Sequence, residues 1–427
     1  MKKTIAWLLA TLLLLAAAAA LVAWLNLRDE IDVRMPVAAI TPGDSLIARG
    51  AYLARAGNCI GCHTARGGIS YAGGRPIDTP FGTVYSSNLT PDDKTGLGSW
   101  SPAHFWRAMH NGRSRDGRLL YPAFPYPNYT QVTREDSDAL FAYFGSLAAV
   151  QQPRTPHALR FPYNSQAALA VWRALYFKPG VYQADRQRSA EWNRGAYLVR
   201  GLGHCAACHT ARNALGASSE ALDLAGGLIP MQNWYAPSLA SPHEAGVGDW
   251  DRQHIVELLK NGVSPRASVT GPMAEVVLRS TQYLSDADLV AMAQFLKELA
   301  PPAPVAVQPA PAAPASVMTL GAKLYEQHCA QCHGEQGRGI PKAYPALAGN
   351  RAVTMAQTAN LVQIVLNGGY APATEGNPRP FGMPPFVLEL GDADIAAVLT
   401  HIRQSWGNQA GIVTPLEVNR MRAASVR

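Results

Sequence analysis

The chain has 427 residues, a length that allows two to four domains. Hydrophobic residues make up 48% and charged residues 16%, a balance that excludes a disordered chain or a coiled coil. The net charge of +7 arises from 37 basic and 30 acidic residues without a dense basic run, so no nucleic-acid partner is expected.

The first 28 residues predict a membrane anchor. Lys2 and Lys3 precede an apolar run over residues 5–25, in which Thr11 is the one polar residue; its length is close to the roughly 20 residues that a membrane-spanning helix needs. A signal peptide usually has a shorter apolar core and a small-residue exit, whereas Trp24 stands near the end of this run. A cleaved signal is the alternative. In both cases the lysines stay in the cytoplasm and the rest of the chain is exported.

The six cysteines fall into three copies of one pattern. The segments CIGCH, CAACH and CAQCH each hold two cysteines separated by two residues and followed by a histidine. This is the attachment pattern of c-type haem, in which both thiols bond to the vinyl groups and the histidine is the proximal iron ligand. The sequence therefore predicts three haems c, bonded to Cys59, Cys62, Cys205, Cys208, Cys329 and Cys332, with His63, His209 and His333 as axial ligands.

Other uses of paired cysteines fit less well. Zinc sites usually combine two such pairs about 15–20 residues apart, whereas these motifs begin at residues 59, 205 and 329. A thioredoxin-like redox site would lie in a βαβ pattern, which the sequence lacks. Three disulfides are the third alternative.

Each motif follows a predicted helix of similar sequence. RGAYLARAGNCIGCHTAR (49–66) matches RGAYLVRGLGHCAACHTAR (194–212) with one inserted residue, and LGAKLYEQHCAQCHGEQGRG (320–339) is a looser copy. Downstream of each motif, an acidic start and an apolar stripe predict a second helix. These helices are expected at 133–147, 284–299 and 390–406, with Thr133, Ser285 and Gly391 as N-caps.

The repeats predict a mainly α fold with three class I cytochrome c-like helical domains in tandem behind the N-terminal anchor helix. A proline-rich stretch before the third domain is expected to be an extended linker. The segment between the first two domains carries enough aromatic residues to pack against the protein. The predicted boundaries are 1–28 for the anchor or signal, 44–150, 191–300 and 317–406 for the domains, 151–190 for the connecting segment, 301–316 for the linker and 407–427 for a polar tail.

Methionine is the usual distal ligand in electron-transfer cytochromes c because it raises the reduction potential. In the third domain Met383 stands in GMPPF, and in the second Met273 stands in GPM. Glycine and proline neighbours predict a stiff loop that holds the sulfur to the iron. Met292 and Met355 lie in helix-like stretches and are expected in the core.

The first domain departs from this rule. When the Asn-Gly pairs that end the preceding helices are aligned, Phe124 takes the place of Met273, and phenylalanine cannot bind iron. The remaining candidates are Met109, His110 and His104. If Met109 is only a core residue, the first haem is five-coordinate or bound by a histidine. His204 and His328 directly precede their motifs, so we expect them on the proximal side.

The segment GGRPIDTPFGTVYSSNLTPDDKTGLGSWS (73–101), the stretch LYPAFPYP around Phe124 and the three motifs resemble the triheme cytochrome c subunit of membrane-bound periplasmic dehydrogenases. The resemblance implies an electron-transfer subunit that is not an enzyme by itself. It also implies a catalytic dehydrogenase partner with PQQ, FAD or molybdenum and iron–sulfur centres. Electrons would pass to membrane ubiquinone, on the periplasmic side of the cytoplasmic membrane.

Many members of this family read YPAMPYP, with the methionine as ligand of the first haem, where this chain has Phe124. The Phe form is more similar to cytochromes paired with molybdenum hydroxylases that oxidise aldehydes or N-heterocycles. No G-x-G-x-x-G dinucleotide motif in a βαβ frame is present. The alternatives are a multihaem peroxidase, which needs an open distal site, and a haem subunit of a terminal oxidase.

Overall fold

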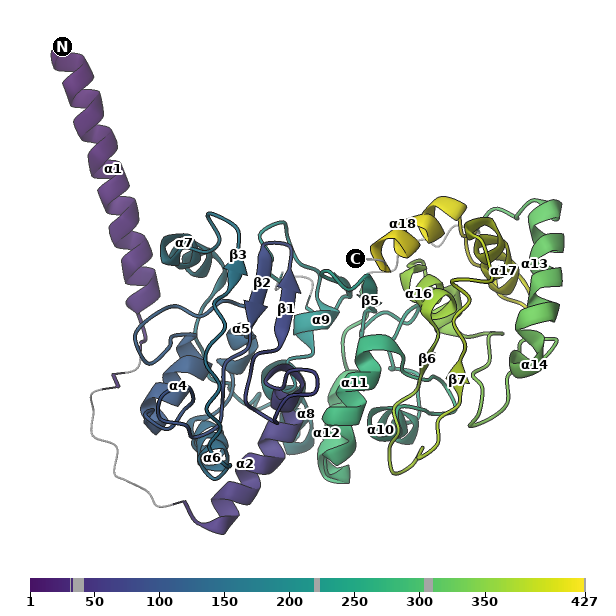
Figure 1. Ribbon diagram of the computed structural model, residues 1–427, viewed down its shortest axis with the longest axis horizontal. Helices are drawn as coiled ribbons and strands as arrows, with labels where there is room; N and C mark the ends of the chain where they lie inside the picture. Colours follow the sequence, from purple (N-terminus) through teal and green to yellow (C-terminus); the bar gives the residue numbers. More distant parts are fainter. Residues whose placement is uncertain (31, 34–41, 219–222, 303–309, 426–427) are drawn as a thin grey trace. The chain divides into compact units, whose positions relative to one another are not determined.

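The computed structural model describes residues 1–30, 32–33, 42–218, 223–302 and 310–425 (Figure 1). The chain divides into two compact units, which are described separately. The first unit comprises Met1–Ala184, Arg200–His204 and Ala214–Ala217, and the second comprises Asp185–Val199, Cys205–Asn213 and Ser218–Arg427. Part of the predicted linker, residues 303–309, lies outside the described residues.

The N-terminal apolar run forms the helix that the sequence predicts. Helix α1 (Lys2–Leu27; Figure 1) contains a stretch with a mean hydropathy of 2.6. Its apolar side chains are exposed along most of its length. A helix of this length and composition can cross a membrane. It therefore fits an anchor.

Three pairs of packed helices form the framework. Helix α2 (Asp44–Ala56) packs on α6 (Arg134–Gly145), α8 (Ala190–Tyr197) on α12 (Asp286–Lys297), and α13 (Ala315–His328) on α17 (Asp392–Gln404). The predicted caps are confirmed: Thr133 Oγ1 accepts from the Asp136 N–H at 3.3 Å, and Ser285 Oγ accepts from the Asp288 N–H at 3.2 Å. Gly391 is the N-cap of α17. In each pair, the first helix precedes a haem motif and the second lies far downstream of it.

A glycine lies where the two helices of each pair cross. A Cβ atom on Gly50 or Gly195 would lie 1.9 Å from a backbone carbonyl oxygen of the opposite helix, and one on Gly321 would lie 2.3 Å away. The crossing distance therefore leaves no room for a side chain. The carbonyl groups concerned belong to Ala139, Ala291 and Ala397.

Short antiparallel hairpins, which the sequence did not predict, follow the motifs. They pair β1 (Pro76–Thr79) with β2 (Gly82–Tyr85), β4 (Gly227–Ile229) with β5 (Trp234–Ala236), and β6 (Gly369–Tyr370) with β7 (Gly382–Met383). The two-residue β3 (Ala158–Leu159) adds to β2. The remaining described elements are α3 (Cys59–Cys62), α4 (Pro102–Asn111), α5 (Tyr126–Tyr129), α7 (Gln166–Tyr176), η1 (Leu198–Leu202), α9 (Ala206–His209), α10 (Arg252–Asn261), α11 (Gly271–Arg279), η3 (Thr281–Tyr283), α14 (Ala330–His333), α15 (Arg351–Thr354), α16 (Ala359–Asn367) and α18 (Pro415–Ser425).

Two segments hold more structure than the sequence indicated. The connecting segment 151–190 contains α7, which buries Leu169 and Arg173. The range 407–427, predicted to be a polar tail, contains α18, whose Val418 is fully buried in the core formed around α17. The few apolar residues of α18 explain why its pattern gave no signal.

In the second unit, the parts around the second and third motifs contact each other directly. The Asn360 amide donates to the Tyr235 carbonyl and accepts from the Tyr235 N–H, both at 2.8 Å. Arg351 forms an ion pair with Asp249 at 2.6 Å and donates to the Gly246 carbonyl at 2.7 Å. These contacts join β5 and the loop that follows it to α15 and α16.

Candidate haem sites

Each Cys-x-x-Cys-His motif forms one tight helical turn. In all three, the histidine N–H donates to the carbonyl of the first cysteine at 2.9 Å. This bond places two cysteines three residues apart on one face of the turn, with the histidine directly after them. The donors are His63, His209 and His333, and the acceptors are Cys59, Cys205 and Cys329.

The ring of each motif histidine is held by a backbone carbonyl. The Nδ1 atoms of His63 and His209 lie 2.7 Å from the Ser87 and Pro237 oxygens, and His333 Nδ1 lies 2.9 Å from the Pro345 oxygen. Because a carbonyl can only accept, Nδ1 carries the proton and Nε2 keeps its lone pair. A neutral imidazole oriented in this way is what an axial iron ligand requires.

Burial favours the neutral form of these rings. It is the main cause that lowers the pKa of His63, His209 and His333, although the bond to the carbonyl acts in the opposite direction. The surroundings therefore favour the neutral imidazole at each motif.

The first cysteine of each motif is also kept neutral. Burial raises the pKa of Cys59 and Cys205 to about 12 and that of Cys329 to about 11. Zinc binding and thiol–disulfide exchange both use the thiolate, so these surroundings favour neither. The six thiols form no disulfide, and within the described ranges no group of three or more His, Cys, Asp or Glu side chains could hold a metal ion.

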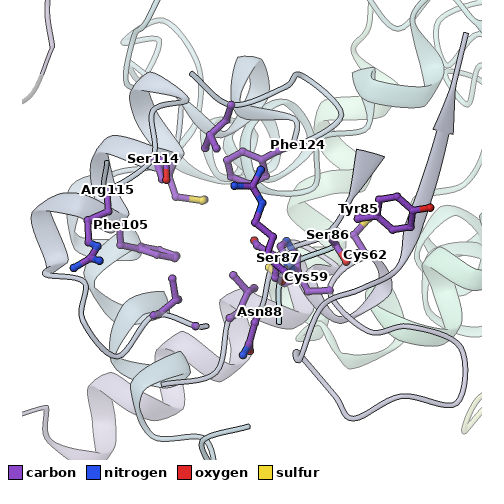
Figure 2. Close-up of a pocket in the computed structure, with 18 of the residues that line it drawn as sticks. Cys59, Cys62, Tyr85, Ser86, Ser87, Asn88, Phe105, Ser114, Arg115 and Phe124 are labelled. Carbon is purple, nitrogen blue, oxygen red and sulfur yellow. Dashed lines mark hydrogen bonds between the residues drawn. The ribbon is translucent and has the colours of Figure 1, made fainter. Parts of the chain in front are cut away.

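A cavity of about 340 Å³ opens onto the first motif (Figure 2). Cys59, Cys62 and His63 all line it. In the view of Figure 2, Phe105 and Arg115 lie at one end and Cys62 at the other. The walls are largely apolar, as a haem face requires, and include Ile77, Val84, Leu89, Leu97, Phe105, Leu120, Phe124, Leu140 and Phe144.

Basic side chains also line this cavity. Arg115, Arg118 and Arg154 all contribute to it, and Asp116, an ion-pair partner of Arg118 at 2.5 Å, lies among them. Burial and then Arg118 lower the pKa of Arg154, while burial and the nearby Arg154 and Arg118 lower the pKa of His157 to about 4. The excess positive charge suits the two carboxylates of a haem, so the cavity fits this cofactor in both its walls and its charge.

Of the three predicted distal ligands for this site, only Met109 lines the cavity. It lies on α4 and is buried. His110 packs elsewhere: its Nδ1 lies 2.8 Å from the Thr130 carbonyl oxygen and its ring stacks on Trp106. His104 takes part in the N-terminal capping box of α4, with its Nδ1 2.8 Å from Ser101 Oγ.

His204 is a residue of this cavity that the sequence did not predict. It lines the cavity of the first motif, although it directly precedes the second motif and was expected on the proximal side of that haem. Its ring stacks on Tyr129 at 5.4 Å between centroids. The Tyr129 hydroxyl in turn donates to the Gly57 carbonyl at 3.3 Å, next to the first motif.

The inserted residue of the second repeat explains this position. An extra residue in an α-helix is commonly accommodated as a π-helical turn, and η1 (Leu198–Leu202) is π-helical. His204 then takes a left-handed backbone conformation with φ of 41°, as Asn58 does before the first motif with φ of 47°. The insertion was the only sequence signal for this arrangement.

The predicted methionines of the second unit lie in regular structure instead of loops. Met273 stands in the first turn of α11, after Gly271, whose φ is 54° and whose added Cβ would meet the Trp234 ring at 2.7 Å. Met383 lies in β7, and its carbonyl approaches Gly368 so closely that a Cβ there would lie 2.4 Å away. Both methionines are partly exposed, whereas Met292 and Met355 are buried, as core residues would be.

Comparison with known proteins agrees with the interpretation of the motifs as sites of haem attachment. The cytochrome c family model matches residues 47–148 and 318–406. The alcohol dehydrogenase (quinone) cytochrome c subunit of Gluconacetobacter polyoxogenes is 39% identical over 396 residues, covering 88% of this chain and 84% of its own. The gluconate 2-dehydrogenase cytochrome c subunit of Pantoea cypripedii is 38% identical over 407 residues, covering 89% and 90%. A nicotinate dehydrogenase subunit of Pseudomonas putida is 41% identical over 392 residues, which cover 88% of this chain and 32% of that protein.

Proposed function

Because the chain belongs to the family of cytochrome c subunits of dehydrogenases, we propose that it carries three haems c and relays electrons from a catalytic subunit to membrane ubiquinone. Members of this family transfer electrons and do not themselves oxidise the substrate. The observation that supports the proposal best is the set of three motif histidines, each with Nδ1 bonded to a carbonyl and Nε2 left to bind iron.

We assign the three haems to three cytochrome c domains, at 44–150, 191–300 and 317–406. The family model covers parts of the first and the third. The second rests on repeated geometry, since Gly195 has the same close approach at its helix crossing as Gly50. The bridge from Thr210 to Gly226 likewise repeats the bridge from Thr64 to Gly73.

The chain would hold each haem by two thioethers and one imidazole. A bound haem c supplies a one-electron iron couple. The cysteine pairs would fix the ring, the carbonyl bonds fix the histidine tautomer, and the apolar walls of the first cavity would exclude water. We assign Met273 and Met383 as distal ligands in the second and third domains, and Met109 is the candidate in the first.

The partner is proposed to be a catalytic dehydrogenase subunit, as the names of the relatives state for their own complexes. The Phe124 variant of the YPAFPYP stretch favours a molybdenum hydroxylase type over an FAD or PQQ type. Helix α1 would anchor the chain, with the haem domains on the periplasmic side of the cytoplasmic membrane. The word quinone in the name of one relative supports ubiquinone as acceptor.

Purification of the complex from its native membrane tests this proposal. We expect mass spectrometry to identify a dehydrogenase subunit in it and to give this chain the added mass of three haems. Turnover of hydrogen peroxide by the chain alone would instead support a peroxidase. Co-purification with a copper–haem membrane subunit would support a terminal oxidase.

If Met109 does not bind the iron, the Phe124→Met substitution is expected to raise the potential of the first haem, because a thioether sulfur stabilises the reduced iron. Spectroelectrochemical titration of the three-haem chain measures the shift. Phe105→Met is the matched control, since Phe105 lines the same cavity. An equal shift of the haem potential in both variants would mean that the polarity of the cavity wall, and not binding of the sulfur to iron, causes it. A drop in potential for Met109→Leu would identify Met109 as the present ligand.

A further inference from the structure

Helix α7 turns an apolar face to the solvent. Ala167, Val171 and Leu175 are exposed and follow one another at intervals of four residues, so they share one face of the helix. Leu175 is 65% exposed, and Phe161, in the turn before the helix, is 84% exposed. Contiguous exposed apolar side chains of this kind mark a surface that contacts a partner or a membrane.

The opposite side of α7 is fixed to the end of the anchor helix (Figure 1). Asn26, the buried residue near the end of α1, donates through Nδ2 to the Ala170 carbonyl at 2.9 Å. Its Oδ1 accepts from Arg173 Nε at 2.9 Å, and Arg173 is buried as well. Helix α7 therefore lies beside the last turn of α1.

The chain just after α1 adds further buried bonds to the same unit. Glu30 forms an ion pair with Arg113 at 3.0 Å and with Arg107 at 3.5 Å. The Asp29 carbonyl accepts from the Asn111 amide at 3.2 Å. Removal of α1 with these residues would take the Glu30 carboxylate from Arg107 and Arg113 and the Asn26 amide from the buried Arg173, which is costly. This network supports retention of the helix in the mature protein.

The length of α1 determines how deep α7 would lie in the bilayer. Its 26 residues span about 39 Å at 1.5 Å per residue, more than the roughly 30 Å of a bilayer's hydrocarbon core. The exported end of α1 therefore reaches the headgroup zone, where Trp24 and the Arg28 guanidinium, 5.7 Å from its ring centre, are well suited. Since α7 is bonded to Asn26, it lies at the same level.

We propose that the exposed face of α7, together with Phe161, lies in the headgroup and upper acyl zone of the bilayer as a second membrane contact. This inference rests on the proposed function to the extent that α1 spans the membrane. An interfacial helix gains free energy from the apolar area that it buries in lipid. Two contacts, α1 and the α7 face, fix the orientation of the first unit on the membrane, where one helix alone would leave it free to rotate.

Photo-crosslinking in the intact complex tests the contact. The full chain, in its native membrane, carries p-benzoylphenylalanine in place of Leu175, and the adducts formed on irradiation are identified by mass spectrometry. Val171 provides a second site on the same face. Ile69, which is 62% exposed in the loop after the first motif, is the matched control, and Leu13 on α1, which is 71% exposed, reports on the anchor.

We expect lipid adducts at Leu175, Val171 and Leu13 and none at Ile69, with the haem content unchanged. Lipid adducts at Leu13 but not at Leu175 or Val171 would overturn the α7 contact and leave the anchor intact. Protein adducts at Leu175, from the dehydrogenase or a second copy of this chain, would overturn it in favour of a subunit interface. Absence of lipid at Leu13 would overturn both the anchor and the contact.

Discussion

Replacement of Gly50 by alanine is expected to disrupt the first helix pair. The new Cβ would lie 1.9 Å from the Ala139 carbonyl oxygen, and real Cβ atoms do not come within 3.0 Å of a neighbour. Because the obstacle is backbone, α2 has to move away from α6 and the packing between them is lost. We expect a destabilisation of about 3 kcal/mol or more, measured by denaturant unfolding of the haem-loaded chain.

The matched control is Gly145→Ala, in the same helix pair. Gly145 ends α6, and a Cβ there would meet nothing within 4 Å. This substitution should be neutral or stabilise the chain by about 0.4–1 kcal/mol, because alanine reduces the freedom of the unfolded state. Equal stability of Gly50→Ala and the unchanged chain would show that the helix crossing has more room than the structure gives it.

The Met383→Ala substitution is expected to lower the potential of the third haem by on the order of 0.2 V, within the roughly 0.8 V range over which axial ligands tune haem iron. Loss of the sulfur would remove the proposed ligand, which favours the reduced state. Spectroelectrochemical titration should show one of the three haems shifted. Met273→Ala should have the same effect on the second haem.

Met355→Ala is the control for Met383→Ala, because it removes a buried methionine from the core without removing a proposed iron ligand. Met355 is 5% exposed and lies at the end of α15, in the same part of the chain as Met383. Its replacement should cost about 2–5 kcal/mol of stability, as for other buried methionines, and leave all three potentials in place. If Met383→Ala shifts no potential, Met383 is not an iron ligand.

The features that depend on neighbouring residues in the chain could be predicted from the sequence. The haem motifs, the helices on both sides of them and the caps at Thr133 and Ser285 depend on neighbours three or four residues away. The carbonyl partners of the motif histidines lie further off, at Ser87, Pro237 and Pro345. Their spacing from the histidine differs in each repeat, so no common pattern identifies them.

The features that the sequence did not predict depend on long-range packing. His204 lines the first cavity because a π-helical turn absorbs an insertion, and nothing in its own neighbourhood indicates the Tyr129 ring on which it stacks. Met273 was expected in a loop because of the preceding Gly-Pro pair. Proline at the second position of α11 instead suits the start of a helix, where its missing N–H costs nothing.

The paired hydrogen bonds between Asn360 and Tyr235 bear on how the third haem domain would meet the second. A domain on a free tether meets its neighbour by diffusion, at an effective concentration that falls as the tether lengthens. Domains docked by such bonds and by the Arg351–Asp249 ion pair keep one separation. Electron transfer between them would therefore depend on these contacts, and Asn360→Ala would weaken the docking while the Arg351–Asp249 ion pair remains.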